Sequence, residues 1–212
     1  MMKVATLVVI ALVACSVLCQ SPVAKAWANQ WQSDFTEKMI LAGSGTSTGK
    51  WYYDWTNKQF RVDRVNGKFD RYCGVGWYIF RNAKCNQYVV NGWRYLHYPE
   101  KNYCCKCCHA SNGCGIVTPT WFQSGAYTGK KSVDSVQVNE WNAKGLQDNI
   151  YAEVVDTRIP KRIYQAPQSD MVFDHNSYSE QINPAVFTLP PKCDSLCPAI
   201  SICGAARREK ME

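Results

Sequence analysis

The stretch YCCKCCHASNGCG, residues 103–115, holds five of the twelve cysteines of the chain. A cluster of this kind is either a disulfide hub in a secreted protein or a thiolate metal site in an intracellular one. The sequence on both sides of it is rich in aromatic residues that alternate with polar ones, as in β-strands. The choice between the two explanations therefore depends on the compartment in which the chain folds.

The first 19 residues have the pattern of a secretory signal peptide. One lysine is followed by an apolar run from Val4 to Val17, which is too short for a membrane span. Cleavage is expected after Cys19, where the run ends, or after Ala26. We therefore expect a secreted, extracellular protein, or one of the lysosomal or vacuolar lumen, without a transmembrane segment.

Removal of this segment takes Cys15 and Cys19 away, and twelve minus two leaves ten cysteines, an even number that suits complete oxidation. Up to five disulfides are predicted, but the sequence does not give their pairing. Adjacent cysteines rarely bond each other because the geometry is strained, so the two sulfurs of such a pair should find different partners. The predicted disulfide cysteines are Cys73, Cys85, Cys104, Cys105, Cys107, Cys108, Cys114, Cys193, Cys197 and Cys203.

A metal site in the cluster is the alternative. Four of its cysteines and His109 could supply soft ligands, but tetrahedral sites usually use a Cys-x₂₋₄-Cys spacing, and these vicinal pairs are crowded for one ion. We therefore expect no metal at this cluster and no cofactor.

The rest of the chain predicts an all-β domain. Phe60 and Val62 alternate with Arg61 and Asp63, and Asn-Gly pairs such as residues 91–92 are strong hairpin signals. The sequence predicts roughly nine or ten short strands spaced about 8–12 residues apart, which is typical of a sandwich or barrel. The prediction is one disulfide-rich β domain over residues 27–205, followed by a charged tail at 206–212.

The N-terminal part of this domain has an ambiguous pattern. Trp27, Trp31, Phe35 and Met39 recur every four residues, which predicts a short helix over 27–41. A strand with the tryptophans facing inward explains the same spacing equally well.

Aromatic residues make up 13% of the chain, with eight tryptophans and twelve tyrosines. On a curved sheet, rings of this size would line a concave apolar site; the alternative is that they fill a closed core. The residues predicted to line a ligand pocket are Trp51, Tyr53, Phe60, Val62, Trp77, Ile79, Trp93, Tyr95, Val138 and Trp141.

Other function classes have less support. The net charge of +7 is scattered along the chain, without the dense basic run of a nucleic-acid binder. The three histidines, His97, His109 and His175, belong to no recognisable nucleophile–base motif, and the cysteines are better explained as disulfides. We therefore expect neither nucleic-acid binding nor enzymatic activity.

Several short motifs come in a familiar order over about residues 50–165. After the aromatic strand at 51–55 come Pro119-Thr-Trp121, Tyr127-Thr-Gly129, Val138-Asn-Glu-Trp141 and Tyr151-Ala-Glu153. In this order the chain resembles the ependymin-related secreted proteins. The resemblance implies two stacked antiparallel sheets curved around a hydrophobic pocket, a lipid-binding role and an association with calcium. The dense cysteine cluster departs from that family, so no disulfide pairing is carried over.

The leading hypothesis is a secreted protein that binds a hydrophobic small molecule or lipid in an aromatic-lined pocket. The alternative is an extracellular structural or adhesive protein, a matrix or cell-surface component, that forms homodimers or matrix contacts and has no small-molecule ligand.

Overall fold

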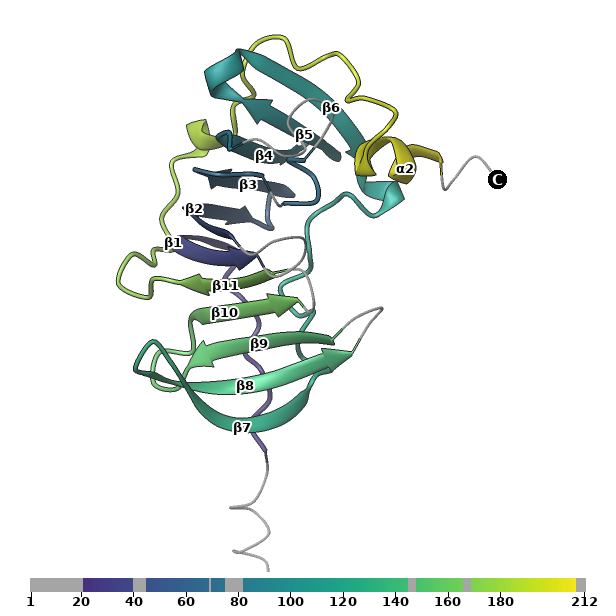
Figure 1. The fold of residues 1–212 in the computed structure, drawn as a ribbon. Coiled ribbons are helices and arrows are strands. Elements are labelled where there is room, and N and C mark those ends of the chain that lie inside the picture. The colour runs from purple at the N-terminus through teal and green to yellow at the C-terminus, as the bar shows by residue number, and fades with distance from the viewer. Residues whose placement is uncertain are drawn as a thin grey trace, which may run out of the picture.

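The computed structural model describes residues 21–39, 45–68, 70–74, 82–144, 148–165 and 169–208. Within these ranges eleven strands form one antiparallel sheet (Figure 1). The strands are β1 (Gln30–Met39), β2 (Gly45–Asp54), β3 (Gln59–Arg64), β4 (Cys85–Val90), β5 (Trp93–Tyr98), β6 (Tyr103–His109), β7 (Ala126–Val133), β8 (Val136–Lys144), β9 (Asp148–Val154), β10 (Pro160–Gln165) and β11 (Ser169–Phe173). Short 3₁₀ turns η2 (Pro99–Lys101), η3 (Ala110–Asn112) and η4 (Pro184–Phe187) and the helix α2 (Ile202–Arg208) complete these elements.

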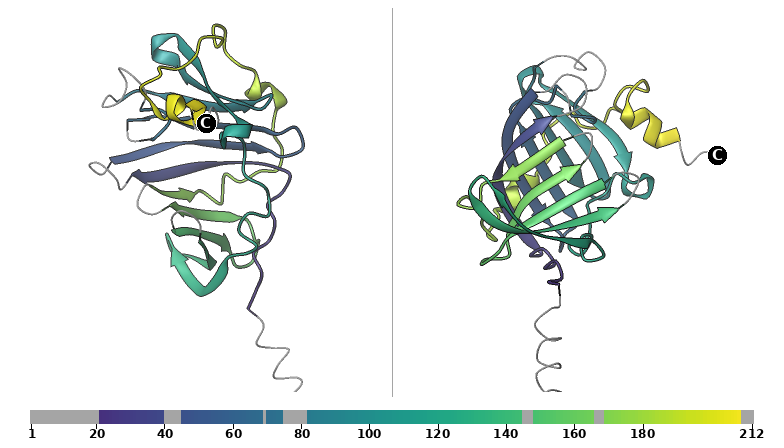
Figure 2. Two further views of the ribbon diagram at one scale, coloured as in Figure 1. Left: turned by 90° about the vertical axis from the view of Figure 1, so that its right-hand side faces the viewer. Right: turned by 60° about the horizontal axis from the view of Figure 1, so that its bottom comes forward.

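The sheet consists of two meanders that join at its centre. Its order is β6-β5-β4-β3-β2-β1-β11-β10-β9-β8-β7, so β1 pairs with β11 and the consecutive strands β6 and β7 lie at opposite edges. The connection between them, residues 110–125, must therefore run across the sheet, and Figures 1 and 2 show it doing so. We call residues 114–125 the crossover segment.

One face of the sheet is concave. Arg94 on β5 and Gln165 on β10 line the same hollow, although six strand steps separate their strands in the sheet order. In a flat sheet those strands would lie about 29 Å apart. The sheet must therefore curl toward the face that carries both side chains, which gives the half-barrel outline seen in Figure 2.

The all-β, disulfide-linked class predicted from the sequence is confirmed. The strands belong to one continuous curled sheet, however, and not to two separate stacked sheets. Of the two alternatives for residues 27–41, the strand is confirmed and the helix is wrong, because residues 30–39 form β1. Alternate side chains of that strand are buried, and a spacing of four residues fits this two-residue period as well as a helical one.

The concave face carries the main core. It contains Trp31 and Phe35 of β1, Tyr53 of β2, Trp141 of β8 and Phe173 of β11, all at most 3% exposed. Segments from outside the sheet add Ala24, Trp27 and Phe122 to this core. The indole of Trp141 also donates to the carbonyl oxygen of Pro22 at 3.0 Å, so residues 22–27 pack as part of the domain.

Asn-Gly pairs predict some turns of the sheet correctly and others not. Asn91 and Gly92 both have positive φ, and they connect β4 to β5 as predicted. Asp134 and Ser135 also have positive φ and form the β7–β8 turn, although no Asn-Gly pair marks it. The Asn-Gly pair at 66–67 lies in the long β3–β4 connection and does not form a two-residue hairpin.

Five disulfides join all ten predicted cysteines. Their pairs are Cys73–Cys85, Cys104–Cys193, Cys105–Cys197, Cys107–Cys203 and Cys108–Cys114. No adjacent cysteines bond each other in these pairs, as the strain argument predicted.

The cysteine stretch is itself a strand, β6, and three of its bridges hold the C-terminal segment 193–208, which we call the tail. The tail also pairs with this strand, since the amide of Lys106 donates to Ser195 O at 2.7 Å and that of Cys197 donates to Lys106 O at 3.0 Å. The tail thus covers one edge of the sheet, which would otherwise offer unpaired backbone groups to other chains.

Gly49 permits close packing at the centre of the sheet. A Cβ atom at this position would lie 1.9 Å from Asp63 O and 2.7 Å from Phe35 Cζ. We expect Gly49→Ala to lower the free energy of unfolding by about 1–3 kcal/mol, the usual cost of overpacking. Urea denaturation measures this, with Thr48→Ala, an exposed position on the same strand, as the control; equal stability of both variants would contradict the prediction.

Candidate functional site

A cavity of about 250 Å³ lies on the concave face between the sheet and the crossover segment. It continues toward a smaller hollow of about 150 Å³, with which it shares Trp51, Arg64, Asp70, Arg71, Val117 and Gln165. The cavity is lined by Trp27, Glu37, Met39, Trp51, Arg64, Asp70, Arg71, Val117, Trp121, Ile163, Gln165, Ser169 and Met171.

Three tryptophans from separate parts of the chain form its aromatic wall. Trp51 lies on β2, Trp27 precedes β1, and Trp121 belongs to the crossover segment. The Trp27 ring meets both others edge to face, with centroids 6.3 Å from Trp51 and 6.2 Å from Trp121. This geometry is favoured by the ring quadrupoles and adds to the area that the rings bury.

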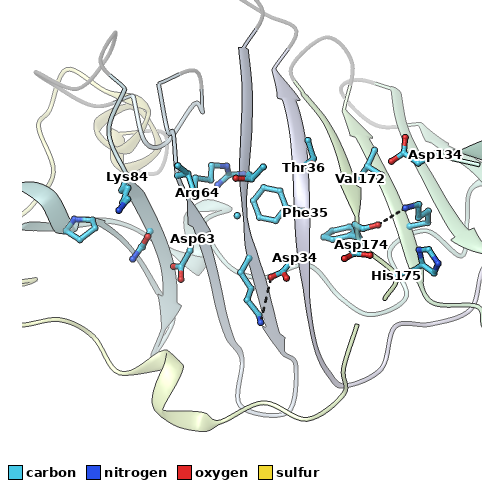
Figure 3. A pocket seen from close by; sticks show the side chains of 18 residues that line it. Asp34, Phe35, Thr36, Asp63, Arg64, Lys84, Asp134, Val172, Asp174 and His175 are labelled. Carbon is cyan, nitrogen blue, oxygen red and sulfur yellow. Dashed lines mark hydrogen bonds and ion pairs between the residues drawn. The ribbon is translucent and has the colours of Figure 1, made fainter. Parts of the chain in front are cut away.

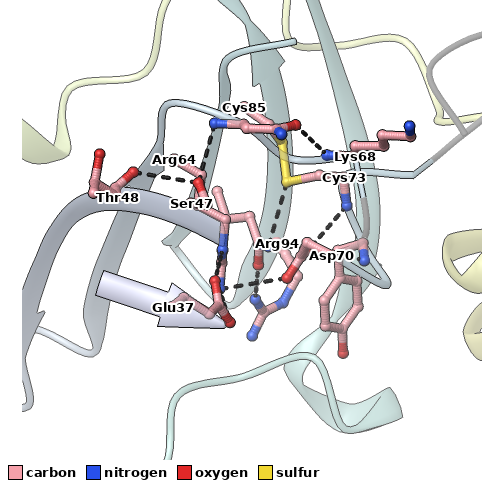
Figure 4. Close-up of polar contacts among 12 residues, drawn as sticks. Glu37, Ser47, Thr48, Arg64, Lys68, Asp70, Cys73, Cys85 and Arg94 are labelled. Atoms are coloured by element: carbon pink, nitrogen blue, oxygen red, sulfur yellow. Dashed lines mark hydrogen bonds and ion pairs between the residues drawn. A yellow bond between two sulfur atoms is a disulfide. The ribbon is translucent and has the colours of Figure 1, made fainter. Parts of the chain in front are cut away.

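The cavity wall also includes a cluster of charged residues, whose polar contacts are drawn in Figure 4. Arg64 on β3 donates from Nε to Glu37 Oε2 on β1 at 2.6 Å, and its Nη2 lies 3.4 Å from Asp70 Oδ2. Arg64 is 7% exposed and Glu37 only 3%. Burial opposes the charge of Arg64, but the carboxylates of Asp70 and Glu37 outweigh it and raise the pKa of the guanidinium above its ordinary value.

A second buried arginine extends this network to the crossover segment. Arg94 Nη1 donates to Gln87 Oε1 at 2.7 Å, and Gln87 Nε2 donates to Asp70 Oδ1 at 2.7 Å. Arg94 also donates to the carbonyl oxygens of Cys114 and Gly115, both at 3.2 Å. Burial lowers the pKa of Arg94 from its ordinary value. The network therefore fixes the start of the crossover segment above the cavity.

Some donors of the cavity wall have no partner. Arg64 Nη1, Trp51 Nε1 and Trp121 Nε1 are buried and make no hydrogen bond in the described part of the chain. A buried N–H group without an acceptor loses its hydration without compensation. Arg64 Nη1 therefore leaves the charged cluster with a donor that no acceptor among the described residues satisfies.

The residues predicted to line a pocket separate into groups. Trp51, Phe60 and Val62 line the cavity or its smaller extension. Tyr53 and Trp141 face the same side but lie in the core, at 0% and 1% exposure.

Three of the predicted residues point to the opposite face. Trp93 and Tyr95 do so because their neighbours on β5, Arg94 and Leu96, take the concave side. Val138 lies three residues from Trp141 on the same strand, and an odd separation puts it on the other face, where it packs with Ala152. Trp77 and Ile79 lie outside the described residues.

The charged residues of the cavity were not predicted from the sequence. Glu37 continues the alternation of Trp31, Ser33 and Phe35, and Arg64 continues that of Phe60 and Val62. Two opposite charges that extend the apolar faces of neighbouring strands could have indicated a buried pair. Trp121, Ile163 and Met171 gave no such signal, because their position depends on the path of the crossover segment and on β11.

The opposite face carries a larger hollow of about 870 Å³, shown in Figure 3. Its lining is mainly polar and includes Asp34, Lys50, Asp63, Lys84 and Asp174. Lys50 Nζ lies 3.7 Å from Asp34 Oδ1, but these side chains are 37% and 53% exposed, so solvent screens the pair. Because it is more open to solvent and most of its lining residues are charged or polar, this hollow is the weaker candidate for a ligand site.

Within the described residues, no group of three or more histidine, cysteine, aspartate or glutamate side chains is placed to hold a metal ion. No helix in those same ranges is long and apolar enough to cross a membrane. The three histidines lie in different settings: His97 on β5, His109 at the end of β6 against Trp93, and His175 beside the large hollow.

No protein-family model matches the sequence, and no curated protein matches it either. Among solved structures, the chain is similar to an uncharacterized conserved protein from Thermus thermophilus, with a TM-score of 0.52 and 9% identity over 82% of this chain and 93% of that one. This likeness shows a shared fold. The relationship to the ependymin-related proteins stays a prediction.

Looser similarities are to MucB and to the LolA superfamily protein NE2245 from Nitrosomonas europaea. MucB has a TM-score of 0.45 and 12% identity over 82% of this chain and 62% of MucB. For NE2245 the TM-score is 0.34 and the identity 8%, over 80% of this chain and 99% of that one. Both TM-scores are below 0.5, so we draw no conclusion from these two similarities.

Proposed function

We propose that this chain is a secreted protein that binds a hydrophobic small molecule, such as a lipid, against the concave face of its sheet. One observation carries the proposal: an aromatic-walled cavity persists on that face under a segment that is separate from the sheet. A concave, mostly apolar site with a few polar groups is the usual form of a small-molecule site.

The cavity is covered by two segments that are not strands of the sheet. Residues 21–29 and the crossover segment touch each other through the amide of Trp27, which donates to Pro119 O at 3.0 Å, and Tyr53 Oη donates to Val117 O at 3.0 Å. The cavity is smaller than the ~300–1,000 Å³ of typical ligand sites. A ligand with a long chain would therefore enter by lifting part of the crossover segment.

Other features agree with this role. Five disulfides favour an oxidising compartment, as expected of a secreted protein. Our proposal includes kinship with the ependymin-related proteins, which would imply the same ligand class. It also includes the absence of enzymatic activity, because the sequence has no recognisable nucleophile–base motif.

The direct test is to purify the protein in its oxidised form from a secreting host and record its native mass spectrum, followed by solvent extraction. We expect an apolar molecule to co-purify, or added lipid to bind with one-to-one stoichiometry. A protein that carries nothing and binds none of a panel of lipids would overturn the proposal. Concentration-dependent assembly in that case would favour the adhesive alternative.

Filling the cavity should block binding. Ile163 lies on β10 and lines the cavity, so Ile163→Trp is expected to lower lipid affinity at least tenfold by occupying the space of the ligand. The matched control is Tyr164→Trp, the next residue on the same strand, which points to the opposite face and should bind as the unchanged protein does. Calorimetric titration of both variants, with circular dichroism as a check on folding, measures the difference. Equal lipid affinities of the two variants would show that the ligand binds outside this cavity.

A further inference from the structure

We infer that the ligand is a single-chain amphiphile with a carboxylate headgroup, and that this headgroup binds at the Arg64 end of the cavity. The inference rests on the proposed function and deepens it by naming the chemical class of the ligand. It comes from the polar atoms of the cavity, considered together with its apolar wall.

The first argument concerns hydrogen-bond partners. In the described part of the chain, every buried side-chain nitrogen or oxygen that lines this cavity and lacks a partner is an N–H donor. Arg64 Nη1 is one of them, on a guanidinium whose other two nitrogens already contact Glu37 and Asp70. Trp51 Nε1 and Trp121 Nε1 are further donors. Only a ligand group that accepts hydrogen bonds can satisfy this set.

The second argument concerns charge. The carboxylates of Glu37 and Asp70 are matched by the buried guanidinium groups of Arg64 and Arg94, so the interior of this cluster is balanced. Arg71 also lines the cavity but is exposed, and it adds one positive charge where the cavity meets solvent. The balanced cluster therefore does not repel a negative headgroup, which can accept a charge-assisted hydrogen bond from Arg64 Nη1, and the added charge of Arg71 opposes a positive headgroup.

The third argument concerns the remainder of the cavity wall. Met39, Ile163 and Met171 supply apolar surface in the same cavity as Arg64 and Arg71. Methionine side chains adapt readily to the shape of a flexible chain. Charged donors and adaptable apolar side chains in one cavity match a carboxylate joined to an alkyl chain.

The test compares three ligands with the same alkyl chain: decanoate, methyl decanoate and decyltrimethylammonium. Calorimetric titration of the oxidised protein at neutral pH should show decanoate binding at least tenfold more tightly than the ester, and the cation most weakly. Equal binding of all three would overturn the carboxylate assignment and leave the proposed hydrophobic-ligand function standing. Binding of none, in this test and in a wider lipid panel, would overturn both.

The salt dependence of binding distinguishes whether Arg64 or Arg71 contacts the headgroup. Because exposed charges are screened by added salt and buried ones much less so, a preference that originates at Arg64 should persist at high ionic strength. Loss of the preference in high salt would assign the headgroup to Arg71 and overturn the placement at Arg64.

A double variant gives the matching test on the protein. Glu37→Gln combined with Arg64→Gln removes both members of the buried pair, so no charge of this pair is left without its partner, and Asp70 keeps the amides of Tyr72, Cys73 and Gln87. We expect the ester to bind this variant within about twofold of its original affinity and decanoate to lose its tenfold advantage. Retention of the full decanoate preference would overturn the role of Arg64.

Discussion

Replacing Arg64 alone with methionine is expected to lower the free energy of unfolding by about 3–5 kcal/mol, the usual cost of removing one partner from a buried ion pair. Glu37 would then keep its charge at 3% exposure without its guanidinium partner. Asp70 would lose one of its contacts as well. Urea denaturation at neutral pH measures the loss.

The pH dependence of this loss identifies its cause. A carboxylate that is buried without a partner is stabilised by protonation, so the penalty should be complete at neutral pH and smaller near pH ~4, where carboxyl groups begin to protonate. Lys50→Met is the control, because its exposed pair with Asp34 should contribute little, within about 0.5 kcal/mol. A penalty for Arg64→Met that does not change with pH would show that lost packing, and not stranded charge, causes the destabilisation.

Removal of the three bridges that hold the tail should have the second large effect. Cys104–Cys193, Cys105–Cys197 and Cys107–Cys203 span 89, 92 and 96 residues. The first bridge to close such a loop contributes about 4–5 kcal/mol in the chain-entropy model, and each further bridge closes only a short loop, worth about 2 kcal/mol. One bridge replaced by two alanines should therefore cost about 2 kcal/mol.

Replacement of all six cysteines should release the tail. Limited proteolysis with mass analysis should then show cleavage between residues 193 and 208, while the variant lacking one bridge stays protected. No tail residue lines the aromatic cavity, so lipid binding should remain within about twofold. A tail that stays protected without its bridges would mean that its backbone pairing with β6 is sufficient to hold it.

The pocket residues illustrate what alternation can and cannot predict. Alternation places Trp51, Phe60 and Val62 on one face, and the structure puts all three at the cavity. On β5 the same rule selected Trp93 and Tyr95, because a charged Arg94 was not expected to face inward. Arg94 does so because Gln87 and two backbone carbonyls satisfy its guanidinium.

The disulfides, too, were predictable from the sequence only in part. Counting cysteines after the predicted signal peptide gave the number of bridges, and the strain between neighbours excluded vicinal pairs. The partners could not be predicted, because three of them lie on a tail that is about ninety residues away in sequence. Only the pairing of that tail with the edge strand brings those sulfurs together.

The sequence by itself determined the β class, the oxidised cysteines and the aromatic character of one sheet face, since composition and a two-residue period are local properties. Tertiary structure alone decided where the cavity lies and what it can bind. Because β6 and β7 lie at opposite edges, the crossover segment must return across the sheet; it does so on the concave face and brings Trp121 into the same cavity as Arg64. That juxtaposition depends on strand order and curvature, which no local pattern in the sequence encodes.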